Sequence, residues 1–86
     1  MTTEEGFIIK AILEALHEAD GRPVSEGVLQ AEACRRSELR FSLSGFTEAL
    51  NVADKNGWLI GTNSRFGKGR IWTLSDAGEA AFHGMR

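Results

Sequence analysis

The sequence predicts a small α+β domain in which three helices are followed by a two-stranded antiparallel hairpin and a short C-terminal helix. Before residue 57, apolar residues recur at helical spacing in three segments. After Gly57 the pattern changes to two short runs of large apolar and β-branched residues with glycines between them. A chain of 86 residues has the length of one domain, so we expect a single core across residues 1–86.

The first helix is expected over residues 3–19. Thr2 and Glu5 have the spacing of a capping box at its start. Asp20 and Gly21 end it, because glycine readily adopts the left-handed conformation that follows a last helical turn. The apolar residues that recur at helical spacing in this segment are Phe7, Ile8, Ala11, Ile12, Ala15, Leu16 and Ala19.

The second helix is expected over residues 26–36. Pro23 favours an extended chain before it, and Ser25 is a good N-cap. Val24 and Leu29 occupy the two positions of a hydrophobic staple. The buried stripe of this helix is expected to contain Val28, Leu29, Ala33 and the small apolar side chain of Cys34.

The third helix is expected over residues 43–56, with Ser42 or Ser44 as its N-cap. A lysine in the last turn followed by Asn-Gly, at residues 55–57, is typical of a helix C-terminus. The side chains expected to be buried are Leu43, Phe46, Leu50 and Ala53, together with Leu39 or Phe41 from the preceding connection.

The hairpin is expected to pair residues 58–65 with residues 70–75. Gly67 and Gly69 supply the conformations that a tight turn requires, and Ser75 is a suitable cap for the last helix. Trp58, Trp72, Ala77, Ala80, Ala81 and Phe82 are expected to pack inward from this part of the chain. The common core is expected to include Ile12, Leu16, Leu29, Phe46, Leu50, Leu59 and Leu74.

Composition argues against several classes of protein. There is one cysteine, no segment with the pattern of a signal peptide, and no apolar run near the roughly 20 residues that span a bilayer. We therefore expect a cytoplasmic protein that contacts no membrane. Cys34, His17 and His83 lack the spacing of metal ligands, and no nucleophile has an evident orienting group. We expect no metal, no cofactor and no enzymatic activity; pairing of two copies through the first helix stays open.

Charge is distributed unevenly along the chain. The net charge is −2, but residues 1–34 carry a net charge of −5, whereas residues 35–70 carry seven bases against three acids. Clustered positive charge suits a surface that neutralises phosphates. The alternative is a solvated surface held by salt bridges, for example between Arg35 and Glu38.

Two stretches resemble the winged helix-turn-helix family. Residues 46–60, where an apolar helix is followed by Asn-Gly and then Trp-Leu-Ile, resemble the end of a recognition helix and the first wing strand. Residues 71–78, Ile-Trp-Thr-Leu-Ser-Asp-Ala-Gly, resemble the pattern that closes the second wing strand. The order of elements extends the resemblance over nearly the whole chain. It implies a winged-helix domain in which helix 43–56 enters the major groove and wing 65–70 contacts the backbone.

The resemblance implies a DNA-binding module, a small transcriptional regulator whose partner is double-stranded DNA. Glu48 on the third helix would face phosphates unfavourably unless it accepts from a cytosine amino group. The acidic first helix and the negative net charge also fit a winged helix that binds a protein and no nucleic acid. The residues expected to contact DNA are Arg35, Arg36, Arg40, Ser44, Thr47, Asn51, Lys55, Arg65, Lys68 and Arg70.

Overall fold

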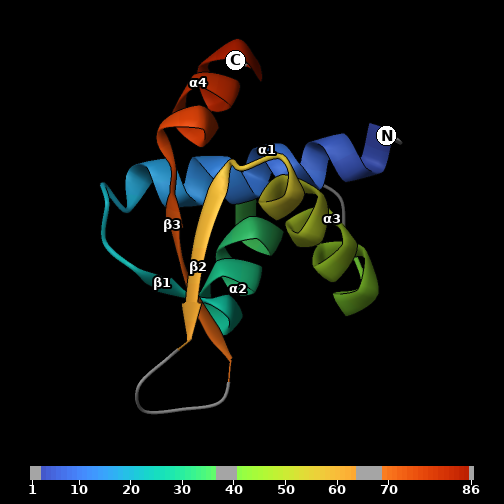
Figure 1. Cartoon of the computed structure of the whole chain (residues 1–86). Helices are drawn as coiled ribbons and strands as arrows, with labels where there is room; N and C mark the ends of the chain where they lie inside the picture. Colours follow the sequence, from blue (N-terminus) through green and yellow to red (C-terminus); the bar gives the residue numbers. More distant parts are fainter. Residues whose placement is uncertain (1–2, 37–40, 64–68, 86) are drawn as a thin grey trace.

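The computed structural model describes residues 3–36, 41–63 and 69–85, and its elements follow the predicted order (Figure 1). The helix predicted over 26–36 has the observed bounds, and the first and third helices each end one residue earlier than predicted. The helices are α1 (Thr3–Glu18), α2 (Glu26–Arg36), α3 (Leu43–Lys55) and α4 (Asp76–Met85). The strands are β1 (Val24–Ser25), β2 (Leu59–Asn63) and β3 (Arg70–Leu74).

The sheet has three strands, one more than the predicted hairpin. β3 lies in the centre, with β2 on one side and β1 on the other, and both pairings are antiparallel. Val24 pairs with Trp72 and Ser25 with Ile71. A strand of two residues has no periodic pattern, so β1 could not be predicted from sequence; the extended chain around Pro23 was the only sign of it. The added strand leaves the fold class unchanged.

Short-range hydrogen bonds explain where the helices begin and end. The Oγ atoms of Ser25, Ser42 and Ser75 each accept a hydrogen bond from the backbone N–H three residues further on, at 3.3, 3.1 and 3.0 Å. Ser42, rather than Ser44, is therefore the cap of α3. Asp20 and Gly21 have positive φ angles of 53° and 82°, which ends α1 within one residue of the predicted position. Thr2, of the predicted capping box, lies outside the described residues.

The core forms around α1, which lies between α4 on one side and α2 and α3 on the other (Figure 1). Because α1 is covered from more than one direction, Ile9 and Leu13 are buried as well as most of the predicted stripe, from Ile8 to Leu16. Of the predicted core residues, Leu74 is only partly buried and the others are buried. Trp72 is buried and Trp58 half-buried, as predicted. No helix in the described part of the chain is long and apolar enough to cross a membrane.

Several residues predicted to be buried are exposed. Val28 and Leu43 are 55% and 63% exposed, and Cys34 is also exposed, so these three predictions are wrong. The inward face of α2 is narrow, with only Leu29 and Ala33 buried. Leu43 is the first residue of α3 and precedes the first buried turn, so helical spacing alone placed it on the wrong side. Phe7, near the start of α1, is exposed too.

Two further segments that were predicted to pack inward, the connection before α3 and the helix α4, differ in part from the prediction. In the connection before α3, Phe41 is half-buried and its ring stacks on that of Phe46, with centroids 6.2 Å apart. Leu39, the other candidate, lies outside the described residues. On α4, Phe82 is buried against α1, whereas Ala77 and Ala80 are exposed and do not pack back as predicted. Ala81, as predicted, and Met85 are partly buried against the core beside Phe82, so these side chains anchor α4.

Candidate nucleic-acid interface

α3 presents a continuous exposed face on the side opposite its buried residues. Phe46, Ala49, Leu50 and Ala53 face the core. Residues four positions apart lie in a row along a helix surface, because four residues are slightly more than one turn. The exposed row on α3 consists of Leu43, Thr47, Asn51 and Lys55, and Ser44 and Glu48 form the row beside it. We refer to the first of these as the outer row.

The polar side chains of the outer row are not engaged within the domain. Among the described residues, Thr47, Asn51 and Lys55 have no side-chain hydrogen bond or ion pair. Exposed acidic groups lie beside the row, at Glu48 and at Asp54. The face therefore offers a hydroxyl, an amide and an ammonium group to an external ligand, together with carboxylates that accept hydrogen bonds.

Arg70 is the first residue of β3, and its side chain lies over the buried indole of Trp72. Its Cζ atom is 5.7 Å from the ring centroid of Trp72, a distance within the range of a cation–π contact. The Trp72 ring is fixed in turn, since its Nε1 donates to Glu26 Oε1 at 3.2 Å. Arg70 is exposed and forms no ion pair with another described residue. Its guanidinium can therefore offer a planar fork of N–H donors to an anion such as phosphate.

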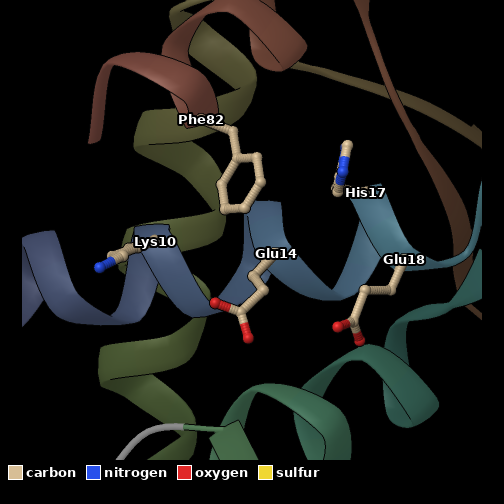
Figure 2. A pocket seen from close by; sticks show the side chains of 5 residues that line it. All are labelled: Lys10, Glu14, His17, Glu18 and Phe82. Atoms are coloured by element: carbon tan, nitrogen blue, oxygen red, sulfur yellow. The ribbon is translucent and has the colours of Figure 1, made fainter. Parts of the chain in front are cut away.

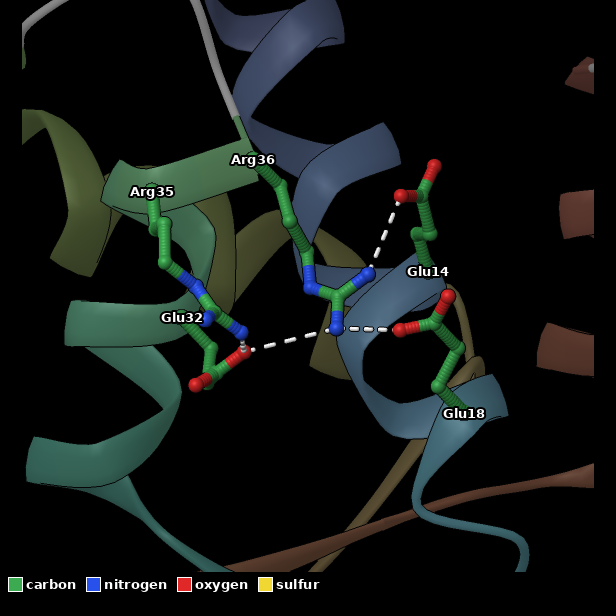
Figure 3. Close-up of polar contacts among 5 residues, drawn as sticks. All are labelled: Glu14, Glu18, Glu32, Arg35 and Arg36. Carbon is green, nitrogen blue, oxygen red and sulfur yellow. Dashed lines mark hydrogen bonds and ion pairs between the residues drawn. The ribbon is translucent and has the colours of Figure 1, made fainter.

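Arg36 lies in a cluster of carboxylates between α1 and α2 (Figure 3). Its guanidinium donates to Glu14 at 3.1 Å and to Glu32 at 3.4 Å, and it also pairs with Glu18. The side chain is only 18% exposed, and its buried Nε atom has no partner among the described residues. Arg35, beside it in sequence, points outward with 70% of its side chain exposed, and its one ion pair within the described part of the chain is with Glu32, at 2.6 Å. The two neighbouring arginines thus have different surroundings.

The same contacts shift the acid–base equilibria of the cluster. The hydrogen bond from Arg36 lowers the pKa of Glu18 below its usual value. The pKa of Glu32 is lowered mainly by its hydrogen bond from Arg35. The pKa of Arg36 is raised, chiefly by its bond to Glu18. Of these contacts, those from Arg36 to Glu14 and Glu18 join α2 to α1, whereas the Arg35–Glu32 pair lies within α2.

The structure brings some of the predicted contact residues together and separates others. Ser44, Thr47, Asn51 and Lys55 share the exposed side of α3, whereas Arg36 is drawn toward α1. Sequence reasoning did not include Leu43, which belongs to the outer row. The signal for the Arg36 contacts was the four-residue spacing from Glu32, which suits an ion pair on one helix. The predicted residues Arg40, Arg65 and Lys68 lie outside the described residues.

A pocket between α1 and α4 contains a second group of polar side chains (Figure 2). Its carboxylates, Glu14 and Glu18, are both paired with Arg36, and His17 Nδ1 lies 2.7 Å from Glu79. Lys10 and the Phe82 ring complete the lining. These polar groups are used mainly in contacts between helices. No group of three or more potential metal-ligating residues occurs in residues 3–36, 41–63 and 69–85.

The arrangement of α2, α3 and the β2–β3 hairpin is that of a winged helix. No known family model and no curated protein matches the chain in sequence. Solved structures do match. A candidate transcriptional regulator from Thermoplasma acidophilum is 22% identical, with a TM-score of 0.73 over 93% of this chain and 75% of that one. A winged-helix DNA-binding protein from STIV is 15% identical, with a TM-score of 0.75 over 99% of this chain and 87% of that one. The chain has the winged-helix fold.

Proposed function

We propose that this chain is a DNA-binding winged-helix module, serving as a small transcriptional regulator or as the DNA-binding part of one. α3 enters the major groove of double-stranded DNA. The observation that carries the proposal is the outer row of α3, whose hydroxyl, amide and ammonium groups have no partner among the described residues. Similarity to a DNA-binding winged-helix protein and to a candidate regulator supports it. We propose the cytoplasm as the location of the protein, because a reducing compartment suits both this role and a single free cysteine.

Each part of the interface has a distinct role in this proposal. Thr47 and Asn51 face base edges, where side-chain amides and hydroxyls form specific contacts. Lys55 and Arg70 neutralise phosphates beside the groove, since both are exposed and neither is in an ion pair with a described residue. We add Ser44 to the residues that face base edges. We add Arg40, Arg65 and Lys68 to the residues that neutralise phosphates.

We assign Arg36 to helix packing rather than to DNA, because phosphate would have to displace three carboxylates from a largely buried guanidinium. Arg35 differs, since its exposed pair with Glu32 is of a kind worth about 1 kcal/mol or less. Phosphate can therefore replace Glu32 at Arg35 at small cost. Arg35 stays in the proposed contact set on this ground.

A salt-dependent titration tests the proposal. A fluorescently labelled duplex of mixed sequence is titrated with the protein at about 50 and about 200 mM salt, and anisotropy is followed. If about four of the six proposed phosphate-binding bases are in contact at once, a plot of the logarithm of the binding constant against that of the salt concentration should have a slope of roughly −3 to −4, because each neutralised phosphate releases counterions.

Variants test whether the proposed surface is the part of the protein that binds DNA. Replacing Arg65, Lys68 and Arg70 together by alanine should weaken binding to all duplexes and flatten the salt slope. Asn51→Ala should change the preference between sequences instead. Lys10→Ala, which removes a base from α1, is the matched control and should leave affinity nearly unchanged. If no duplex binds at low salt, the proposal is wrong and a protein partner becomes the leading alternative.

A further inference from the structure

Leu43 is the most exposed large apolar side chain in the described part of the chain, at 63%. It lies in the first turn of α3 and heads the outer row, ahead of Thr47 and Asn51. Along this row the helix therefore presents the isobutyl group of Leu43, then the methyl group of Thr47, and then the amide of Asn51. An exposed leucine adds little to the core, and at this place on the row it gives the polar face of α3 an apolar group that a ligand can cover.

The major groove of DNA displays one kind of apolar group, the C5-methyl of thymine. Asparagine is the side chain suited to adenine, to which it can bond at N6 and N7 together. The common guanine-binding side chains are arginine and lysine. α3 contains no arginine, and its single lysine, Lys55, lies in the last turn. The chemistry of the row therefore matches A·T base pairs and lacks a group for guanine.

We propose that α3 selects A·T base pairs, with Leu43 and Thr47 contacting thymine methyl groups and Asn51 bonding to adenine. This inference rests on the proposed function, since it names the base pairs that the same helix contacts. Four helical residues advance about 6 Å, so Leu43 and Asn51 lie about 12 Å apart along the axis. That distance covers three to four base pairs at about 3.4 Å each.

Glu48 is compatible with this selection. It lies in the row beside Thr47 and Asn51 and is exposed. As an ionised carboxylate it only accepts hydrogen bonds, and the major-groove donors are the amino groups of adenine and cytosine. Because every G·C pair also presents a cytosine amino group, Glu48 does not by itself distinguish A·T from G·C pairs. In an A·T site, Glu48 can accept a hydrogen bond from an adenine amino group beside the base that Asn51 contacts.

The experiment compares two duplexes that differ only in the thymine methyl group. One is an alternating A·T duplex. In the other, which we call the deoxyuracil duplex, deoxyuridine replaces every thymidine. A G·C duplex of equal length is a third, separate probe. Loss of one buried methyl contact costs about fourfold in affinity. With two such contacts, we expect the deoxyuracil duplex to bind about 15-fold more weakly than the thymine duplex. The G·C duplex should bind more weakly than the thymine duplex.

Two variants assign the effect to the named residues. Leu43→Ala should reduce the preference for thymine over deoxyuracil to about fourfold, and the addition of Thr47→Ser, which removes only a methyl group, should abolish it. Phe7→Ala, which truncates another exposed apolar side chain on α1, is the control and should keep the full preference. Circular dichroism confirms that each variant is folded.

The possible outcomes separate the inference from the function on which it rests. Equal binding of the thymine and deoxyuracil duplexes would overturn the A·T selection while the DNA-binding proposal stands. A thymine preference that persists in the Leu43→Ala, Thr47→Ser double variant would overturn the assignment to these residues. If no duplex binds at any salt concentration, both proposals fail together.

Discussion

Gly61 on β2 lies directly against the indole of Trp72 on β3. The two residues are cross-strand partners, and a Cβ atom at position 61 would come within 2.6 Å of the ring carbon Cζ3. The ring is only 2% exposed and is fixed by its hydrogen bond to Glu26. A residue without a side chain therefore allows the indole to lie across the neighbouring strand, where it also supports Arg70.

Gly61→Ala should lower the free energy of unfolding by about 1–3 kcal/mol, because the new methyl group displaces a well-packed ring. The shift in the urea midpoint and the change in tryptophan emission report this. Gly6→Ala is the matched control, since a Cβ at that helical position meets nothing within 4 Å and alanine favours helix. Its stability should equal or exceed that of the parent. A Gly61→Ala variant as stable as the parent would contradict the packing described here.

Leu50→Ala and Leu43→Ala compare the two sides of α3. Leu50 is buried in the common core, so its truncation should cost about 2–5 kcal/mol. Leu43 is largely exposed, and its truncation should change stability by about 0.5 kcal/mol or less. Urea denaturation followed by circular dichroism measures both. Equal losses in the two variants would show that the buried face of α3 has been wrongly assigned.

Arg36→Met should destabilise the domain at neutral pH by about 1–3 kcal/mol, because it leaves Glu14, Glu18 and Glu32 close together without their shared cation. Arg35→Met is the matched control. Its contact with Glu32 is exposed and screened by solvent, so its loss should change stability far less than the loss of Arg36. Thermal and urea unfolding of both variants at pH 7 make the comparison, and equal effects would argue against a special role for Arg36.

The same cluster predicts how stability depends on pH. Because the pKa values of Glu18 and Glu32 are lowered in the folded state, the unfolded chain binds more protons in the acid range. Their contribution is fully present above the usual value of 4.5 and is lost as pH falls through the lowered values. The deficit of Arg36→Met relative to the parent should therefore shrink from pH 7 to about pH 3. A deficit independent of pH would contradict this.

Local patterns predicted the elements whose boundaries depend on nearby residues. Ser25, Ser42 and Ser75 bond to the backbone three residues on, so their positions in the sequence predicted the caps, although Ser44 stayed an alternative to Ser42 until the structure decided between them. Gly78, part of the closing motif after β3, is explained by packing: a Cβ there would overlap the carbonyl oxygen of Trp58. β1 could not be predicted, because two residues that pair with a distant strand leave no pattern of their own.

The candidate site was predictable only where residues share one helix. Thr47, Asn51 and Lys55 follow four-residue spacing, so their common face could be foreseen. The exposure of Leu43 could not, since spacing does not show where the covering elements stop. The different surroundings of Arg35 and Arg36 depend on how α1 packs on α2, since Glu14 and Glu18 lie on the preceding helix, well beyond the reach of local helical spacing. Such contacts are set by tertiary packing.

Amide chemical-shift mapping tests most directly whether the exposed face of α3 meets DNA. Isotope-labelled protein is titrated with an A·T duplex, and backbone amide signals are followed across the described elements. We expect the largest changes at Ser44, Thr47 and Asn51 on α3 and at Arg70 on β3, with little change on α4, which lies on the far side of α1 (Figure 1). Changes centred on α1 and α4, with α3 unaffected, would contradict the account.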